Sequence, residues 1–203
     1  MRITVIGSTS PTGLEVLRNG IARGYELVAF TRRPSLLSTN PGINQIVTGD
    51  GVHLSDLQQA ISGSDGVIAI VGGKANVAKV MRNIIKAMEV AEVGRLVFVS
   101  SYLLEAKRPW PTVPVARWIF RREMGQLNEA EHVIRNCSLN WTIYRPTQLN
   151  DKPATGRWRI QERGNDFTTG PYQICRADLA AALVEAVTQD TNDRGIYSVT
   201  WGK

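Results

Sequence analysis

The sequence is poor in the residues that build metal centres, disulfide scaffolds and membrane spans. Its 203 residues include two cysteines and two histidines, and Cys137 and Cys175 have neither metal-ligand spacing nor the numbers of a disulfide framework. No apolar run reaches the roughly 18–20 residues of a membrane-spanning helix. The N-terminus lacks a charged segment followed by a long apolar stretch, so it does not resemble a signal peptide. We therefore expect a cytoplasmic protein that binds no metal, with both thiols buried as small apolar residues.

Acidic residues are outnumbered by basic ones, and the formal net charge is +6 at pH 7. The basic residues cluster in part at Arg32-Arg33, at Lys107-Arg108 and at Arg121-Arg122. No zinc pattern and no basic repeat interleaved with aromatic residues accompanies them, which argues against a nucleic-acid-binding protein. We expect a basic surface around a site for an anionic small molecule. The protein is expected to be a monomer or weak homodimer with no nucleic-acid or membrane partner.

Short apolar runs alternate with helical patterns along the whole chain. This pattern is typical of a parallel sheet that is covered on both faces by helices. The expected strands span residues 3–6, 26–30, 43–47, 66–71, 95–99, 141–144 and 196–200. Expected helices begin after residue 13 and span 54–61, 77–88, 118–135 and 177–187. The sequence thus predicts a single Rossmann-like, doubly wound α/β domain over residues 1–203, with the irregular stretch 150–172 forming a small substrate-side lobe.

The opening segment, MRITVIGSTSPTG, carries the clearest functional signal. A short apolar strand ends at Gly7, a turn rich in Ser, Thr and Pro follows, and helical spacing begins after Gly13. Such a loop directs backbone N–H groups and the positive end of a helix toward one point, where a phosphate can bind. Ser10 stands in the place of the middle glycine of a G-x-x-G-x-x-G loop. A glycine-capped turn without a ligand is the alternative interpretation.

Residues that follow the other strands are expected at the same edge of the sheet, because open α/β sheets bind ligands at the carboxyl ends of their strands. Arg32 and Arg33 follow the second strand, where an NAD-specific protein usually has an acidic residue, and they suit the 2′-phosphate of NADP. Asp50 follows the third strand and can accept a hydrogen bond from adenine. Gly72 and Gly73 follow the fourth strand and let a ribose and diphosphate approach the backbone. Each position also fits a plain turn or a solvated surface residue.

The proton relay of many short-chain dehydrogenases is missing. Ser100, Ser101 and Tyr102 follow the fifth strand, but none of the five tyrosines begins a Tyr-x-x-x-Lys pattern. Hydride transfer to an acceptor that needs little acid catalysis, such as a flavin, is compatible with this absence. After the sixth strand, Thr147 and Gln148 can orient an acceptor, and residues 151–156 are expected to form a loop beside the nicotinamide.

Six segments, in order along the chain, resemble the atypical short-chain dehydrogenases of the NAD(P)H-flavin reductase and biliverdin-IXβ reductase type, a group that includes NmrA-like sensors. The segments are GSTSPTG, TRRP, VTGD, SSYLL, NWTIYRPTQLNDKPATG and CRADLAAALVEAV. The resemblance spans about residues 1–200. It implies a single Rossmann-like domain, NADPH as the hydride donor, and flavin or linear tetrapyrrole acceptors in an open pocket.

The resemblance also implies roles for individual residues. It assigns the 2′-phosphate to Arg32 and Arg33, and it matches Ser101 to the active-site serine of the family. Gln148 stands where the biliverdin reductase has a histidine near the acceptor, which favours a flavin over biliverdin. The residues assigned to the diphosphate are Gly7, Thr9, Ser10, Pro11, Thr12 and Gly13. Those also expected against the cofactor are Ser100, Pro146 and Thr147.

The sequence therefore predicts an NADPH-dependent oxidoreductase that passes hydride to FMN, riboflavin or another conjugated acceptor. The flavin is expected as a substrate and not as a bound prosthetic group. One alternative is a non-catalytic NADP(H) sensor that binds a partner protein. Another is a nucleotide-sugar epimerase-like protein, against which the missing Tyr-x-x-x-Lys pattern argues.

Overall fold

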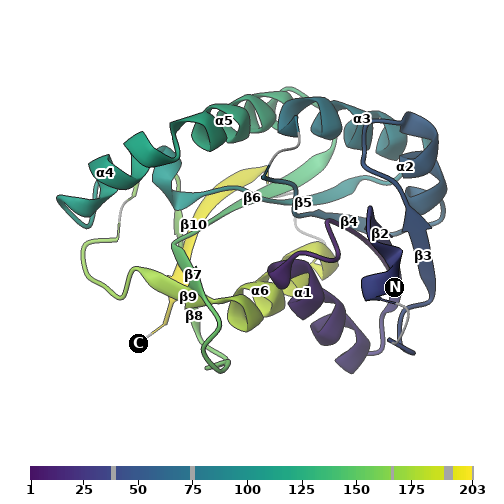
Figure 1. Cartoon of the computed structure of the whole chain (residues 1–203), viewed down its shortest axis with the longest axis horizontal. Coiled ribbons are helices and arrows are strands. Elements are labelled where there is room, and N and C mark those ends of the chain that lie inside the picture. Colours follow the sequence, from purple (N-terminus) through teal and green to yellow (C-terminus); the bar gives the residue numbers. More distant parts are fainter. Residues whose placement is uncertain (38–39, 74–75, 166, 190–193, 203) are drawn as a thin grey trace.

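A computed structural model describes residues 1–37, 40–73, 76–165, 167–189 and 194–202, which form an α/β domain with helices on both faces of a sheet (Figure 1). Within these residues, eight strands form the central sheet in the order β3-β2-β1-β4-β5-β6-β10-β8. Their bounds are β1 (Arg2–Ile6), β2 (Glu26–Thr31), β3 (Gln45–Thr48), β4 (Gly66–Ala69), β5 (Arg95–Val99), β6 (Asn140–Pro146), β8 (Trp158–Glu162) and β10 (Gly195–Trp201). All neighbours pair in parallel except β8, which runs antiparallel to β10. The predicted doubly wound sheet is confirmed.

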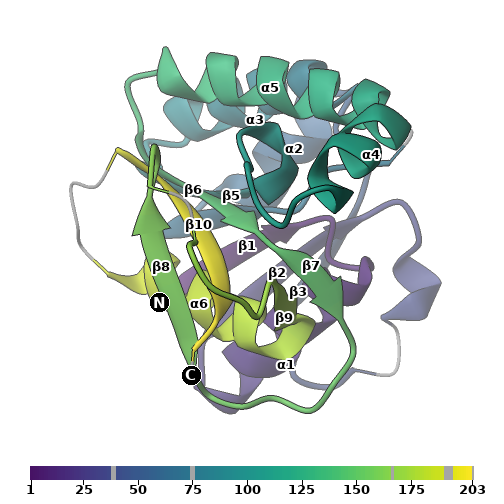
Figure 2. The ribbon, with the colours of Figure 1, turned by 90° about the vertical axis from the view of Figure 1, so that its left-hand side faces the viewer.

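Two layers of helices enclose the sheet (Figures 1 and 2). One face is covered by α1 (Pro11–Ala22) and α6 (Arg176–Thr188), and the other by α2 (Leu54–Ile61), α3 (Val77–Val90) and α5 (Arg121–Arg135). Beyond α5, α4 (Thr112–Ile119) lies at one end of the molecule. Two short 3-10 turns are η1 (Pro34–Leu36) and η2 (Tyr102–Leu104).

Each helical layer buries its own apolar core against the sheet. Met81, Ile84 and Met88 lie on one face of α3 at helical spacing and pack in a cluster with Phe98 of β5. On the opposite face of the sheet, Leu17 of α1 belongs to a second cluster together with residues of α6. The strands between the two cores are therefore buried on both sides, which explains their continuous apolar runs.

The order of the strands creates a switch point beside β1. This strand pairs in parallel with β2 on one side and with β4 on the other. The chain leaves β1 toward β2 and later crosses back to begin β4. Loops that leave the carboxyl ends of β1 and β4 consequently diverge, and a crevice opens between them.

Two predicted elements differ from the structure. The helix expected over 118–135 is two helices, because Phe120, with φ −97° and ψ 20°, separates α4 from α5. The irregular stretch 150–172 contains β8, which joins the main sheet, so the expected lobe reduces to a two-stranded sheet of β7 (Gln148–Asn150) and β9 (Gln173–Cys175). β8 is the edge strand of the sheet, and its sequence WRIQE contains charged residues and no continuous apolar run. The pattern of a buried strand therefore does not predict it.

The two thiols are not equally buried, contrary to expectation. Cys175 is fully buried at the N-terminus of α6, whereas Cys137 is only partly buried. Burial raises the pKa of both thiols, which keeps them protonated and unreactive at neutral pH.

Candidate functional site

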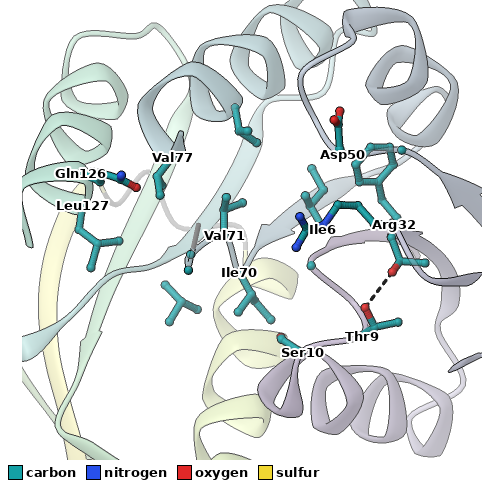
Figure 3. Close-up of a pocket in the computed structure, with 18 of the residues that line it drawn as sticks. Ile6, Thr9, Ser10, Arg32, Asp50, Ile70, Val71, Val77, Gln126 and Leu127 are labelled. Atoms are coloured by element: carbon teal, nitrogen blue, oxygen red, sulfur yellow. Dashed lines mark hydrogen bonds between the residues drawn. The ribbon is translucent and has the colours of Figure 1, made fainter. Parts of the chain in front are cut away.

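A cavity of about 430 Å³ lies at the carboxyl ends of β1, β2 and β4. Figure 3 shows Arg32 and Asp50 on one side of this first cavity, and Gln126 and Leu127 on the other, with Val71 between them. The cavity thus crosses the switch point from the end of β2 toward α5. This is the place and the elongated form that a dinucleotide requires in an open α/β sheet.

Gly7 and Gly13 are both required by the geometry of the β1–α1 loop. Gly7 has φ +82°, and a Cβ there would lie 2.1 Å from the carbonyl oxygen of Ile70. At Gly13, a Cβ would lie 2.4 Å from the carbonyl oxygen of Gly7 and 2.8 Å from Cα of Ser8. No side chain fits at either position without moving backbone. The glycines therefore permit the sharp turn and the close approach of α1 to β1.

Ser10 replaces the middle glycine without distorting the loop. Its φ of −70° and ψ of 156° are open to any L-residue, and its Oγ accepts a hydrogen bond of 3.0 Å from the N–H of Gly13. Ser10 is thus the N-cap of α1, with Pro11 following it at the first turn. Among the residues that the structure describes, no acceptor is found for the N–H groups of Thr9 and Thr12. These donors, at the positive end of α1, can bind an anion.

Hydroxyl groups fasten this loop to the end of β2. The buried Ser8 Oγ donates to the carbonyl of Phe30 at 3.0 Å. Thr9 Oγ1 lies 2.8 Å from Thr31 Oγ1, which also accepts from the N–H of Arg33 at 3.0 Å (Figure 3). The loop and the two arginines are therefore held in a fixed relation. Ser8 and Thr31 were not expected from the sequence to take part, although both are small hydroxyl residues directly after or at the end of apolar strands.

Arg32 and Arg33 carry positive charge that no carboxylate neutralises within the described parts of the chain. Both side chains are exposed and line the first cavity. Arg33 Nη2 lies 3.4 Å from the carbonyl oxygen of Thr9, while Arg32 extends into the cavity (Figure 3). This end of the cavity is therefore suited to an anionic group.

The remaining residues predicted to bind cofactor fall into three places. Asp50, Gly72 and Gly73 line the first cavity together with Thr9 and Ser10. Pro11, Thr12 and Gly13 lie behind it at the start of α1, where they shape the loop. Ser100 lies at the far end of the first cavity, but Pro146 and Thr147 line a second cavity instead.

The second cavity, of about 500 Å³, adjoins the first at Ser100, which lines both. Its walls are largely apolar and include Leu103, Val113 and Phe120. The structure places Ser101 and Gln148, the two residues predicted to be catalytic, at this second cavity. Ser101 Oγ accepts from the N–H of Leu103 at 3.3 Å, and the Gln148 side chain is exposed.

Thr147 does not present its hydroxyl to an acceptor. Its side chain is buried, and its Oγ1 donates to Thr200 Oγ1 at 3.0 Å. Thr200 in turn donates to the carbonyl of Pro171 at 2.7 Å. The hydroxyl therefore joins β6 to β10 and the segment before β9, and Gln148 is left as the polar group that can orient an acceptor.

Ser100 is held by a buried ion pair that the sequence did not reveal. Its Oγ donates to Oε1 of Glu131 at 2.6 Å, and Glu131 forms a two-pronged contact with Arg145, with Nε–Oε1 at 2.8 Å and Nη2–Oε2 at 2.6 Å. Glu131 on α5 and Arg145 on β6 are 1% and 4% exposed. Only the packing of α5 over β5 and β6 brings the three residues together. The contact fixes the one side chain that both cavities share.

The network continues to the surface through Glu105, which contacts Arg145 at 2.8 Å and Arg163 at 2.7 Å. Hydrogen bonds from Arg163 and Arg145 lower the pKa of Glu105 to about 2. Burial alone would lower the pKa of Arg145, but its bonds to Glu131 and Glu105 outweigh that effect and raise it. Hydrogen bonds to Glu105 raise the pKa of Arg163 as well, so Glu105 and the two arginines stay charged at neutral pH.

The segment 151–156 is not placed beside either cavity, contrary to expectation. It is tied instead to the buried carboxylate of Asp178 on α6. Asp178 accepts from Thr155 Oγ1 at 2.7 Å, from Gly156 N at 2.9 Å and from Trp201 Nε1 at 2.8 Å. Burial raises the pKa of Asp178, but these donors outweigh it and leave the pKa below its usual range. The segment is therefore linked through Asp178 to both α6 and β10, where it stabilises their packing.

Gln126 on α5 was also missed by sequence reasoning. Its Oε1 is buried without a hydrogen-bond partner in the described structure, and the side chain lines the first cavity beside Leu127, on the side opposite to Arg32 (Figure 3). Buried polar atoms without a partner are rare in folded proteins. This acceptor is therefore suited to a ligand donor at that end of the cavity.

No group of three His, Cys, Asp or Glu side chains within the described ranges could hold a metal ion. Over the same residues, no helix is long and apolar enough to cross a membrane.

Comparison with known proteins agrees with this geometry. A family model described as NAD(P)H-binding matches residues 7–190. The UPF0659 protein YMR090W of Saccharomyces cerevisiae is 21% identical over 201 residues, which cover 92% of this chain and 87% of the yeast protein.

Solved structures show the same fold. The structure named ChuY, an anaerobillin reductase from Escherichia coli O157:H7, is 24% identical with a TM-score of 0.83 over 100% of this chain and 98% of that chain. A short-chain dehydrogenase/reductase from Veillonella parvula in complex with NADP is 19% identical with a TM-score of 0.82, over 98% and 93% of the two chains.

Proposed function

Because the chain belongs to the NAD(P)H-binding family, we propose that it is a reductase that passes hydride from NADPH to a flat conjugated acceptor such as FMN or riboflavin. The observation that carries the proposal is the junction of two cavities at Ser100. At the end opposite to Ser100, the first cavity is lined by Arg32 and Arg33, which suit phosphate groups. The second cavity has largely apolar walls. A donor and an acceptor bound in them would meet at the shared wall.

The residues present fit NADPH. The unpaired N–H groups of Thr9 and Thr12 at the start of α1 suit a diphosphate. Arg32 and Arg33, without carboxylate partners in the described structure, suit a 2′-phosphate. At the other end, the unpaired Gln126 Oε1 can accept a hydrogen bond from a carboxamide.

The acceptor cavity is built to position a ring system more than to protonate it. Tyr102 stacks against Tyr172 with ring centroids 6.5 Å apart, and both line the second cavity. Ser100 Oγ donates a hydrogen bond to Glu131 and is thereby oriented, while Ser101 and Gln148 offer polar groups at the second cavity. Such a site aligns an acceptor but lacks the tyrosine–lysine pair that protonates an alkoxide.

NADPH, when bound, supplies a hydride, and reduction of a flavin needs in addition one proton. Addition of the hydride leaves the reduced flavin as an anion, and this anion can take the proton from water, which gives the neutral dihydroflavin without a proton donor of the protein. The protein's own contribution is then proximity and orientation. The E. coli structure is named an anaerobillin reductase, which supports a reductase activity for this chain.

Steady-state oxidation of NADPH and of NADH, each with FMN or riboflavin as acceptor, tests the proposal. Turnover with a clear preference for NADPH is expected. Tight NADPH binding, seen by cofactor fluorescence, without turnover on flavins or quinones would contradict a reductase and favour the NADP(H) sensor. Failure to bind either nucleotide would contradict both.

A further inference from the structure

Residues 107–122, with the sequence KRPWPTVPVARWIFRR, cover the outside of the second cavity with exposed apolar side chains. Trp110 and Trp118 are 76% and 69% exposed. Val115 and Ile119 lie beside Trp118 on one face of α4, at positions i, i+3 and i+4. We call the exposed residues of this segment the Trp–Arg surface.

Both faces of α4 are apolar. Val113 and Ala116 line the second cavity, as does Phe120 directly after the helix, whereas Val115, Trp118 and Ile119 lie on the outer face. A helix that is apolar on all sides is normally buried. The outer face of α4 is not, because α4 lies at the end of the molecule, past the last helix of its layer (Figure 1). Contiguous exposed apolar side chains of this kind mark an interaction site.

The charge of the Trp–Arg surface is of one sign. Five basic residues and no acidic residue occur between positions 107 and 122. Arg117 donates to the carbonyls of Leu103 at 2.9 Å and Ala106 at 2.8 Å, and the guanidinium of Arg121 lies 5.6 Å from the centre of the Trp118 ring. These partners are neutral, so they orient the two guanidinium groups and leave their charge uncompensated.

Although the sequence led us to expect no membrane partner, we propose that the Trp–Arg surface docks α4 onto an anionic lipid surface. Tryptophan side chains are favoured at the boundary between headgroups and acyl chains, and lysine and arginine beside them bind anionic headgroups. A second copy of the chain is a poorer occupant, because a two-fold contact would set identical arginines against each other. Docking in this orientation places the second cavity next to the bilayer, with α4 between them. If the proposed reductase activity is right, an acceptor dissolved in the membrane has a short path to the cavity.

Flotation of the intact protein with vesicles tests the proposal without any assay of activity. Vesicles of phosphatidylcholine mixed with phosphatidylglycerol are compared with vesicles of phosphatidylcholine alone. The protein is expected to float with the anionic vesicles and not with the neutral ones. Raising NaCl from about 0.05 to about 0.5 M should release most of it, because the Debye length falls about threefold and the attraction between the basic side chains and the anionic headgroups is screened.

Two variants and one control locate the surface. Each basic residue contributes about fivefold to binding, so Arg108→Glu with Arg122→Glu should weaken the partition onto anionic vesicles by at least about thirtyfold. Trp118→Ser with Ile119→Ser should abolish flotation at either salt concentration. The matched control, Arg23→Glu with Lys86→Glu, makes the same charge change on exposed residues of other elements and should lower binding much less.

Circular dichroism of each variant shows whether it is folded. Equal flotation with neutral and anionic vesicles, or equal loss in the control and in the Arg108 and Arg122 variant, would overturn the proposal. A wild-type dimer in sedimentation velocity that becomes a monomer in the Trp118 and Ile119 variant would also overturn it, and would assign the surface to a second copy. None of these outcomes depends on whether the protein reduces flavins.

Discussion

Arginines at the ends of β2 and β6 differ in how far their charges are neutralised. Arg32 and Arg33 have no carboxylate partner in the described residues, whereas Arg145 forms ion pairs with both Glu131 and Glu105. A charged group that is exposed and unpaired at a cavity can bind a ligand, while one that is buried and paired holds structure. Substitution of Arg32 and Arg33 should therefore affect ligand binding, whereas substitution in the Arg145 ion pairs should affect stability.

Replacing Arg32 and Arg33 together with alanine should remove selectivity for NADPH. A charge-assisted hydrogen bond contributes about 1.5–3 kcal/mol, so the Kd for NADPH should rise about tenfold to a hundredfold. The Kd for NADH, which has no 2′-phosphate, should stay nearly unchanged. Fluorescence titration measures both. Arg23→Ala, an exposed arginine at the end of α1, is the control, and an unchanged ratio of the two Kd values in the double variant would show that the arginines do not select NADPH.

Glu131→Gln should weaken folding far more than its position on a surface helix suggests. The change leaves Arg145 as a buried charge with a neutral partner, which costs about 3 kcal/mol of the free energy of unfolding. Urea denaturation measures this loss. Glu129→Gln, an exposed residue on the same helix, should change stability by less than about 0.5 kcal/mol. If both variants were equally stable, the buried pair would not support the fold.

Among the elements, the β1–α1 turn and α5 place opposite demands on glycine. At Gly13, a Cβ would meet backbone atoms at less than 3 Å, whereas at Gly125, in the middle of α5, it would meet nothing within 4 Å. Glycine is therefore required at the first position for space. At the second it only lowers the stability of the helix.

Gly13→Ala should weaken nucleotide binding and stability together, because α1 must move away from β1 to admit the methyl group. Gly125→Ala should instead raise the free energy of unfolding by about 0.5–1 kcal/mol and leave binding unchanged. Thermal unfolding with and without NADPH measures both effects. Unimpaired binding in Gly13→Ala would mean that the loop does not hold the diphosphate as proposed.

At the scale of the whole molecule, stability should fall in acid. The pKa values of Glu105 and Asp178 are lowered in the folded state, the first to about 2. A carboxyl group with a lowered folded pKa stabilises the fold above its unfolded pKa of about 4, and this stabilisation is lost as the pH falls toward the folded value. The loss should therefore begin below about pH 5 and grow toward pH 2.

Glu105→Gln should reduce this dependence on acid. Its midpoint of thermal unfolding should fall less between pH 6 and pH 3 than that of the wild type, because one of the shifted groups is gone. The effect should be modest, since the side chain is 41% exposed and solvent screens its ion pairs. Glu162→Gln, an exposed neighbour, is the control. The same fall in Glu105→Gln as in the wild type would show that the Arg145–Glu105–Arg163 contacts do not stabilise the fold.

Local pattern was enough to predict seven of the strands of the main sheet, most of the helices around it and the residues of the first cavity. Each depends on neighbours in sequence: apolar runs mark buried strands, and the carboxyl ends of parallel strands meet at one edge. Gly7, Ser10, Arg32, Asp50 and Gly72 could therefore be placed together from their positions after strands.

Tertiary packing decided what sequence spacing does not encode. Glu131 resembles any helix carboxylate until α5 packs over β6 and sets it against Arg145 and Ser100. The same packing separates Pro146 and Thr147 from the first cavity and leaves the outer face of α4 uncovered. Contacts within a helix or strand follow from the spacing of residues along it. Contacts between elements depend on how the helices and strands pack in three dimensions. That is why this sequence by itself determined most of the main sheet and the residues of the first cavity, and only the three-dimensional structure decided the second cavity and the ion pair beneath it.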